Sequence, residues 1–256
     1  MDKKVAIVTG GGSGIGKASA LRLAEEGFRV GIMDVKEHRA MDVQDKIVSL
    51  GGEAMAIDLD VSDEQRVIAG LEEVNKHWGR LDVVFENAGI NGTFAPIEEL
   101  GAEEWEKTIQ INLKGTFLMV KHSIPYLKQR GGSIVITSSV NGTRTFSNIG
   151  MSAYSTSKAG QAAFMKMAAL ELAAYKIRVN AICPGAIRTN IDQNTEKKGH
   201  LEEVEIPVEY PDGKQPLENG PGSPEQVADL VCYLVSEKAS HVTGTEVFVD
   251  GAESLL

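Results

Sequence analysis

The sequence predicts a doubly wound α/β fold, in which a seven-stranded, mostly parallel sheet carries helices on both faces. Short apolar runs typical of buried strands alternate along the chain with longer segments of helical periodicity. The connections are short, and right-handed crossovers between parallel strands place helices on both sides of the sheet. No repeat or linker divides the 256 residues, so we expect a single domain over residues 1–256.

Strands and helices are expected in strict alternation. The strands are expected near residues 4–9, 29–34, 54–59, 81–86, 132–138, 177–183 and 245–249. The helices are expected near residues 14–26, 37–50, 63–78, 103–129, 153–174 and 224–235. The segment from about 190 to 223 differs because it is polar, acidic and broken by prolines, and long loops in compact domains are usually functional or disordered. We expect it to form a lid over a substrate.

The first strand leads directly into a glycine-rich turn. The apolar run over residues 5–8 precedes the turn, and a helix is expected to begin near Gly14. Glycines permit a tight turn and leave no side chains where a phosphate would lie, and a helix N-terminus directs free N–H groups at that position. The candidate ligands of a nucleotide diphosphate are Gly10, Gly12, Ser13, Gly14, Ile15 and Gly16. An ATP-binding P-loop is disfavoured, because Ala18 stands where that motif needs a hydroxyl for magnesium.

An acidic residue ends the second strand. Asp34 follows the glycine turn by about 20 residues, which suits two hydrogen bonds to the hydroxyl groups of an adenosine ribose. The same carboxylate would repel a 2′-phosphate. The turn and Asp34 together favour NAD over ATP and NAD over NADP. Lys36 and Arg39 follow closely and leave slow use of NADP open.

Tyr154 and Lys158 lie four residues apart at the start of the helix expected over 153–174, so their side chains share one helix face. A phenol with a pKa of about 10 is a poor base at neutral pH, and a neighbouring ammonium favours the phenolate. Lowering that pKa by three units needs about 4 kcal/mol. The ammonium and the cationic ring of oxidised nicotinamide would supply it together in a partly dry site.

Polar motifs accompany the remaining strands, whose carboxyl ends are where ligands bind in open α/β sheets. The turn Asn87-Ala88-Gly89 follows the strand over 81–86, and the pair Ser138-Ser139 follows the run over 132–137. The other candidates are Asn112 in the run I-N-L-K-G, Pro184 and Gly185 after the strand over 177–183, and then Ile187 and Thr189.

These motifs, in this order, make the chain resemble the short-chain dehydrogenase/reductase superfamily from about Lys4 to Gly251. The resemblance implies a Rossmann fold and a catalytic tetrad of Asn112, Ser139, Tyr154 and Lys158. It also implies that Tyr154 and Lys158 contact the cofactor. The other cofactor-binding residues that it implies are Asp60 and Val61 at the adenine, Asn87, Ala88 and Gly89 beside the adenosine ribose, Pro184 and Gly185, and Ile187 and Thr189 at the nicotinamide carboxamide.

The resemblance implies direct hydride transfer between a substrate carbon and nicotinamide. Tyr154 would be the general acid/base at the substrate oxygen, and Ser139 would hydrogen-bond that oxygen and stabilise its developing charge. Lys158 would bind the nicotinamide ribose and lower the pKa of Tyr154. Asn112 would hold a water that links Lys158 to solvent. No catalytic metal is implied.

The composition limits which binding partners and which cellular compartment we expect for the protein. No apolar run is long enough to span a bilayer and no signal peptide precedes the first strand, so no membrane partner is expected. Cys183 and Cys232 have no paired spacing, which favours a cytoplasmic location. A net charge of −10 argues against nucleic acid and anionic membranes. In the family that the chain resembles, the long helices of neighbouring subunits pack against each other, so the resemblance implies a homotetramer.

The substrate class stays open. The loop between Ser139 and Tyr154 is longer than the family's commonest spacing, and its residues Asn141, Arg144 and Asn148 favour a small polar secondary alcohol or ketone, such as a sugar or polyol. A second interpretation is a 3-oxoacyl-[acyl-carrier-protein] reductase of fatty-acid synthesis, which the acidic chain and the cofactor preference disfavour. A third, from another class, is a non-catalytic NAD(H)-binding sensor, which the complete tetrad disfavours.

Overall fold

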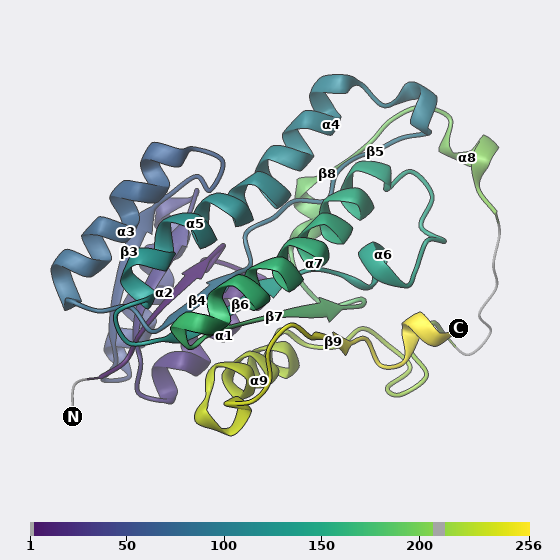
Figure 1. Ribbon diagram of the computed structural model, residues 1–256. Coiled ribbons are helices and arrows are strands. Elements are labelled where there is room, and N and C mark those ends of the chain that lie inside the picture. The colour runs from purple at the N-terminus through teal and green to yellow at the C-terminus, as the bar shows by residue number, and fades with distance from the viewer. Residues whose placement is uncertain (1–2, 207–212) are drawn as a thin grey trace.

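The computed structural model describes residues 3–206 and 213–256 (Figure 1). Over these residues seven parallel strands form one sheet in the order β3-β2-β1-β4-β6-β7-β9. Its strands are β1 (Val5–Thr9), β2 (Arg29–Asp34), β3 (Glu53–Asp58), β4 (Val83–Glu86), β6 (Gly132–Thr137), β7 (Ile177–Pro184) and β9 (Glu246–Val249). The predicted doubly wound fold is confirmed, and the strand ends lie within about two residues of those predicted.

Helices cover both faces of the sheet. They are α1 (Gly14–Glu25), α2 (Glu37–Ser49), α3 (Glu64–Trp78), α4 (Ala102–Ile109), α5 (Gly115–Leu127), α6 (Val140–Thr143), α7 (Ser152–Leu172), α8 (Leu201–Val204) and α9 (Pro224–Val235). In Figure 1, α5 and α7 cover one face and α9 lies against the other. None of the helices in the described part of the chain combines the length and the apolar character needed to cross a membrane.

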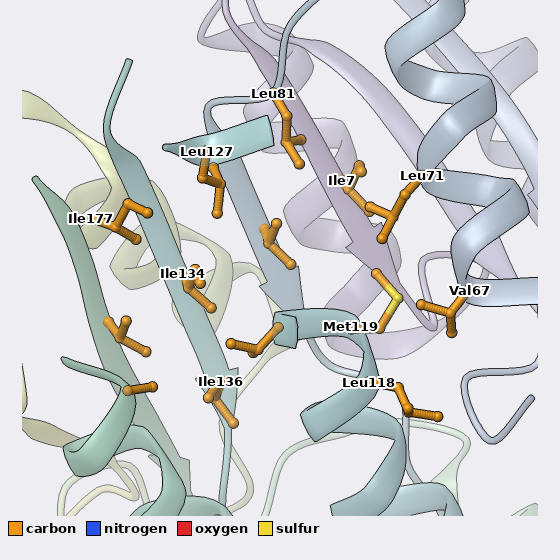
Figure 2. Close-up of a cluster of buried hydrophobic side chains, with 14 of the residues drawn as sticks. Ile7, Val67, Leu71, Leu81, Leu118, Met119, Leu127, Ile134, Ile136 and Ile177 are labelled. Atoms are coloured by element: carbon orange, nitrogen blue, oxygen red, sulfur yellow. The ribbon is translucent and has the colours of Figure 1, made fainter. Parts of the chain in front are cut away.

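The core consists of two apolar layers, one on each face of the sheet. In Figure 2, Ile7 of β1 lies beside Leu71 of α3. Ile134 of β6 and Met119 of α5 belong to the same layer, and all four side chains are fully or almost fully buried. The second layer joins the opposite face to α1, α2 and α9. Strands buried on both faces need continuous apolar runs, which explains why residues 5–8 are all apolar.

Local signals fix several helix ends. The Asp63 side chain accepts hydrogen bonds from the amides of Gln65 and Arg66 at the start of α3, and Gly79 ends that helix in the left-handed conformation with a φ of 70°. Ser223 forms a capping box at the start of α9, with Pro224 at its first position. These helices begin and end close to where the sequence predicts.

The strand order places a crevice at the carboxyl ends of the strands. β1 pairs with β2 on one side and with β4 on the other, so the chain winds outward in opposite directions from this point. Open α/β sheets bind ligands at such a switch point, because the loops leaving the two central strands diverge there.

The prediction of a single regular helix over 103–129 is wrong. The segment consists of α4, a π-helical stretch over Gln110–Lys114, and α5. One extra residue in the turn changes the backbone hydrogen bonds but disturbs the apolar periodicity too little for the sequence to reveal it. Asn112 lies within this π-helical stretch.

The segment expected to form a lid contains short elements that the sequence did not predict. Strand β8 (Thr195–Lys197) pairs in parallel with β5 (Gly92–Phe94), and α8 follows. Three-residue strands are too short to show a periodicity of two. Residues 207–212 of the expected lid lie outside the described residues.

Candidate active site

A cleft of about 750 Å³ opens at the carboxyl edge of the sheet. It brings together most of the residues singled out in the sequence. Those lining it are Gly10, Ser13, Gly14, Ile15, Asp34, Asp60, Val61, Asn87, Ala88, Gly89, Ser139, Tyr154, Lys158, Pro184, Gly185, Ile187 and Thr189. Three predicted site residues do not line it, namely Gly12, Gly16 and Asn112.

The glycine turn is built so that its backbone can face a ligand. Gly10 and Gly14 have φ values of 60° and 51°, which L-residues with side chains rarely adopt. A Cβ on Gly16 would lie 2.2 Å from the Gly10 carbonyl oxygen, so Gly16 serves the packing of α1 against the turn rather than direct contact.

The N-terminus of α1 has room for an anion. Its N-cap residue, Ser13, makes no side-chain capping bond within the described structure, and the first turn carries no acidic residue. The free N–H groups and the positive end of the helix dipole therefore face the cleft, as the diphosphate of a dinucleotide requires.

The Asp34 carboxylate is held in place by two backbone amides. The N–H of Gly12 donates to Oδ2 at 3.0 Å and the N–H of Lys36 donates to Oδ1 at 2.9 Å. The residue is buried but lines the cleft together with Lys36 and Arg39. Each carboxylate oxygen keeps further acceptor capacity, which suits the hydroxyl groups of a ribose.

Thr9 organises the turn beside the ribose position and was missed by the sequence analysis. Its Oγ1 accepts hydrogen bonds from the amides of Asn87 at 2.9 Å and Ala88 at 3.0 Å, and its carbonyl accepts one from the Asn87 side chain at 3.2 Å. The only signal for it was a polar residue ending an otherwise apolar strand.

Helix α7 carries Tyr154 and Lys158 into the cleft. The Lys158 ammonium donates to the Thr137 carbonyl at 2.8 Å and lies 5.6 Å from the centre of the Tyr154 ring. Ser139 begins α6 and lines the cleft nearby, while the Ser138 hydroxyl donates to the Lys158 carbonyl at 2.8 Å. The two serines therefore differ, because the hydroxyl of Ser138 already donates to α7.

Burial dominates the ionisation of both groups. It raises the pKa of Tyr154, and the Ser139 hydroxyl opposes that increase. It lowers the pKa of Lys158 to about 8, against the opposing effects of Glu86 and Cys183. The lower pKa expected for Tyr154 is therefore not found in the protein without its cofactor, where desolvation is the largest effect on the phenol and the Lys158 ammonium is bonded to Thr137.

Asn112 lies behind the cleft wall with its hydrogen-bonding groups engaged. Its side chain donates to the Ile90 carbonyl at 2.9 Å and to the Ser157 hydroxyl at 3.0 Å, and accepts the Ile90 amide at 2.9 Å. The backbone carbonyl of Asn112 accepts hydrogen bonds from the Thr116 hydroxyl and from the Gln161 side-chain amide, each at 2.8 Å. Both lone pairs of that carbonyl therefore have protein donors, and Asn112 joins the loop after β4 to α7.

The loop after β7 is anchored from distant parts of the chain. The amide of Ala186 donates to the Glu253 carboxylate at 2.9 Å, and the backbones of Arg188 and Gly222 bond at 2.9 Å. Glu253 also lines the cleft. The sequence offered no local signal for this residue.

Several amide side chains are among the residues that line the cleft. Asn141 and Asn148 line it as expected and bond to each other at 2.6 Å. The expectation that Arg144 lines the same pocket is wrong. Its guanidinium stacks instead on the Phe248 ring of β9, 3.5 Å from the ring centre. Asn91, Asn190 and Asn194 were not predicted and line the cleft as well.

No cluster of three or more His, Cys, Asp or Glu side chains within residues 3–206 and 213–256 is arranged to hold a metal ion. Asp58 pairs with Arg66 at 3.0 Å, whereas Asp60 accepts from the Ser62 hydroxyl at 2.7 Å and lines the cleft. The two carboxylates after β3 therefore have separate surroundings.

Known proteins share the whole of this architecture. The family described as enoyl-(acyl carrier protein) reductase matches residues 10–252. Cyclohexanol dehydrogenase of Acinetobacter sp. (strain SE19) is 38% identical over 252 residues, covering 98% of this chain and 95% of that protein. The crystal structure of a 3-ketoacyl-ACP reductase from Sinorhizobium meliloti 1021 superposes with a TM-score of 0.94 at 49% identity, covering 98% of this chain and 99% of the other.

A further structure bears on the cofactor. The 3-ketoacyl-(acyl-carrier-protein) reductase of Brucella melitensis, complexed with NADH, superposes with a TM-score of 0.86 at 29% identity and covers 98% of each chain. The resemblance read from the motifs is thus confirmed: the chain belongs to the short-chain dehydrogenase/reductase superfamily and is a nicotinamide-dependent oxidoreductase acting on CH–OH groups.

Proposed function

We propose that the protein transfers a hydride between NAD and a small secondary alcohol or the corresponding ketone. The observation that carries the proposal is that Ser139, Tyr154 and Lys158 line the same cleft as the glycine turn and Asp34. A dinucleotide whose diphosphate lies at α1 and whose adenosine ribose lies at Asp34 would extend its nicotinamide toward these three side chains.

Tyr154 is the proposed general acid/base at the substrate oxygen, and Ser139 the proposed hydrogen-bond donor to that oxygen. Lys158 is proposed to bind the nicotinamide ribose. When bound, NAD would accept or return the hydride, and its oxidised ring would add positive charge beside Tyr154. Because burial raises the pKa of Tyr154 in the protein alone, Lys158 and the oxidised cofactor act on it together in this proposal. Asn112 is proposed to position the loop after β4 and α7.

The preference for NAD over NADP rests on Asp34. Its carboxylate is oriented by the amides of Gly12 and Lys36, so it faces the cleft in a defined position. A 2′-phosphate there would meet a fixed negative charge. Lys36 and Arg39 also line the cleft, and their positive charges would permit slow use of NADP.

The asparagine side chains that line the cleft support a small polar alcohol, such as a sugar or polyol, as the substrate. Asparagine side chains there offer both donors and acceptors to hydroxyl groups. The likeness to the Sinorhizobium meliloti structure favours a second candidate, a 3-oxoacyl thioester bound to an acyl carrier protein.

The remaining expectations extend this proposal. Residues 190–223 would act as a lid, which the pairing of β8 with β5 beside the cleft supports. Residues 1–256 would form one catalytic domain. Four copies would assemble, because α5 and α7 leave Phe117, Met167 and Leu170 exposed. A cytoplasmic location is supported by free Cys183 and Cys232.

Initial rates followed by nicotinamide absorbance test the proposal. NAD and NADP are offered with cyclohexanol, sugars, polyols and other secondary alcohols, and NADH and NADPH with acetoacetyl thioesters. NAD-linked oxidation of a polar alcohol is expected. NADPH-linked reduction of the thioester as the main activity would overturn the cofactor and substrate proposals. Cofactor binding without turnover of any substrate would favour the non-catalytic sensor.

A further inference from the structure

Glu86 is a fully buried acid that the proposed reaction does not yet use. It ends β4, immediately before the Asn87 turn, and is only 1% exposed. Among the described residues neither of its carboxyl oxygens has a partner at full hydrogen-bond geometry, and the Thr9 hydroxyl of the neighbouring strand β1 is the donor that acts on it. It pairs in register with Ile136 of β6, next to Thr137, whose carbonyl accepts the Lys158 ammonium.

Burying a carboxyl group in this position destabilises the fold, so a functional role would explain why it is there. Burying an ionised carboxylate without partners costs several kcal/mol, and an apolar side chain of similar volume would avoid that cost. Burial raises the pKa of Glu86 to about 8, and the nearby Thr9 hydroxyl and Lys158 ammonium only partly offset the effect. Glu86 therefore keeps its proton at neutral pH and releases it under weakly alkaline conditions.

The Lys158 ammonium is bonded to the carbonyl of Thr137, the residue after the register partner of Glu86, and its charge acts on the Glu86 carboxyl. The titratable groups acting on Lys158 are Glu86 from β4 and Cys183 from β7, with Tyr154 one turn away on α7. Cys183 is in turn influenced by Glu246 of β9, and its pKa is raised to about 11, so it stays neutral throughout the range of interest. Burial raises the pKa of Glu86 and lowers the pKa of Lys158, so the two groups are brought toward the same pH range and lose their first proton as a coupled pair.

We propose that Glu86 is a positioning residue for the reaction, whose carboxylate keeps Lys158 in its ammonium form as the surroundings become alkaline. On alkalinisation the pair releases one proton to solvent through the cleft that Lys158 lines, and the remaining proton stays on Lys158. The charge required beside Tyr154 and at the nicotinamide ribose then persists to higher pH. The inference rests on the proposed function of Lys158.

Alcohol oxidation against pH tests the inference with Glu86→Gln, which keeps the shape and removes the ionisation. Without the carboxylate, Lys158 loses its proton at lower pH, so the alkaline limb of kcat/KM should move down by about one pH unit. The ratio of variant to wild-type kcat/KM should fall about tenfold between about pH 7 and about pH 9.5. Glu86→Asp should restore much of the alkaline limb.

A matched control separates this effect from loss of any negative charge. Glu237→Gln removes one carboxylate from an exposed ion pair with Lys4, and neither residue lines the cleft. Its alkaline limb should coincide with that of the wild type. A parallel pH profile for Glu86→Gln and Glu237→Gln would overturn the inference.

Two readouts do not depend on turnover. The first is NADH affinity, followed by fluorescence. As the pH is raised, the affinity should begin to fall at a lower pH in Glu86→Gln than in the wild type. The second readout is the free energy of unfolding without cofactor. Because folding raises the pKa of Glu86 from 4.5 to about 8, the protonated carboxyl contributes its full stabilisation below about pH 4.5, and this contribution is lost as the pH rises through about 8. The stability of Glu86→Gln relative to wild type should therefore rise between these values and level off above them.

These readouts distinguish the two possible failures. If the wild type oxidises no alcohol with NAD, the proposed function fails, while NADH affinity and stability still report on Glu86. If neither NADH affinity nor stability changes its pH dependence in Glu86→Gln, Glu86 does not act on Lys158. Glu86→Met, which removes the charge without leaving a buried amide, replaces the glutamine variant in each measurement if that variant does not fold.

Discussion

Asp34 is the residue on which cofactor choice depends. Replacing it by alanine removes the acceptor for the ribose hydroxyls and the charge that would repel a phosphate. We expect kcat/KM for NAD to fall about tenfold to a hundredfold in Asp34→Ala, by the loss of one or two charge-assisted hydrogen bonds. The value for NADP should stay the same or rise.

Asp58 provides the matched control for that measurement. It ends the neighbouring strand in register with Asp34, but it pairs with Arg66 and does not line the cleft. Asp58→Asn should leave the NAD/NADP ratio unchanged. An unchanged ratio in Asp34→Ala would contradict the assignment of Asp34 to the ribose.

The paired serines should separate chemistry from packing. Ser139→Ala removes the proposed donor to the substrate oxygen and should lower kcat by about 10²–10³ with little change in NADH affinity. Ser138→Ala removes the bond to the Lys158 carbonyl and should lower the free energy of unfolding by about 1 kcal/mol. Steady-state kinetics and denaturant unfolding on both variants check this, and a larger kinetic defect in Ser138→Ala would reverse the assignment.

Residues with local signatures could be located from the sequence, and residues defined by distant partners could not. Asp34 and Tyr154 stand at recognisable distances from a glycine turn or a lysine. Thr9, Glu86 and Glu253 matter because of the residues that the fold brings to them, up to 79 positions away for Thr9 and 67 for Glu253. Spacing in the sequence carries no information about such contacts.

At the scale of elements, Gly16 joins the glycine turn to α1. An added methyl group would meet the Gly10 carbonyl oxygen and the Asn87 side chain, so the helix would have to move away from the turn. Gly16→Ala should lower the free energy of unfolding by about 1–3 kcal/mol and weaken NADH binding. Gly220→Ala, where a Cβ meets no atom within 4 Å, is the control for calorimetry, and NADH titration is compared with the wild type. Equal behaviour of the two variants would contradict this interpretation of the turn.

Element prediction succeeded where caps and periodicity agree. Asp63, Gly79 and Ser223 mark helix ends with chemistry that acts within three residues. The π-helical stretch over Gln110–Lys114 has no such local signal, and its Asn112 carbonyl accepts a hydrogen bond from Gln161 of α7. That partner lies 49 residues along the chain, so no local pattern could indicate it.

At the scale of the whole molecule, alternation of strands and helices determined the fold class, and the fold class determined where the cleft lies. Parallel strands align their carboxyl ends, so motifs far apart in the chain meet at one edge. Two parts of the cleft do not follow from this rule in detail. Asn190, Ile191, Asp192 and Asn194 belong to a long insertion in the connection from β7 to α9, and Glu253 follows the last strand, β9.

Assembly is the property of the whole molecule that remains a prediction. Phe117, Met167 and Leu170 leave apolar surface on α5 and α7 that a second copy would cover. Light scattering after size exclusion should give four times the 27.5 kDa of one chain. The double variant Phe117→Glu, Leu170→Glu should give a smaller mass. A wild-type mass equal to one chain at micromolar concentration would contradict the proposed tetramer.

The most direct test of the proposed chemistry follows a labelled hydride. The secondary alcohol that reduces NAD fastest is supplied with deuterium on its carbinol carbon, and the product NADH is weighed by mass spectrometry. Direct transfer predicts one deuterium on the NADH, and Tyr154→Phe should form it about 10²–10⁴ times more slowly while still binding NADH. NADH without deuterium, or an undiminished rate in Tyr154→Phe, would contradict a hydride transfer assisted by Tyr154.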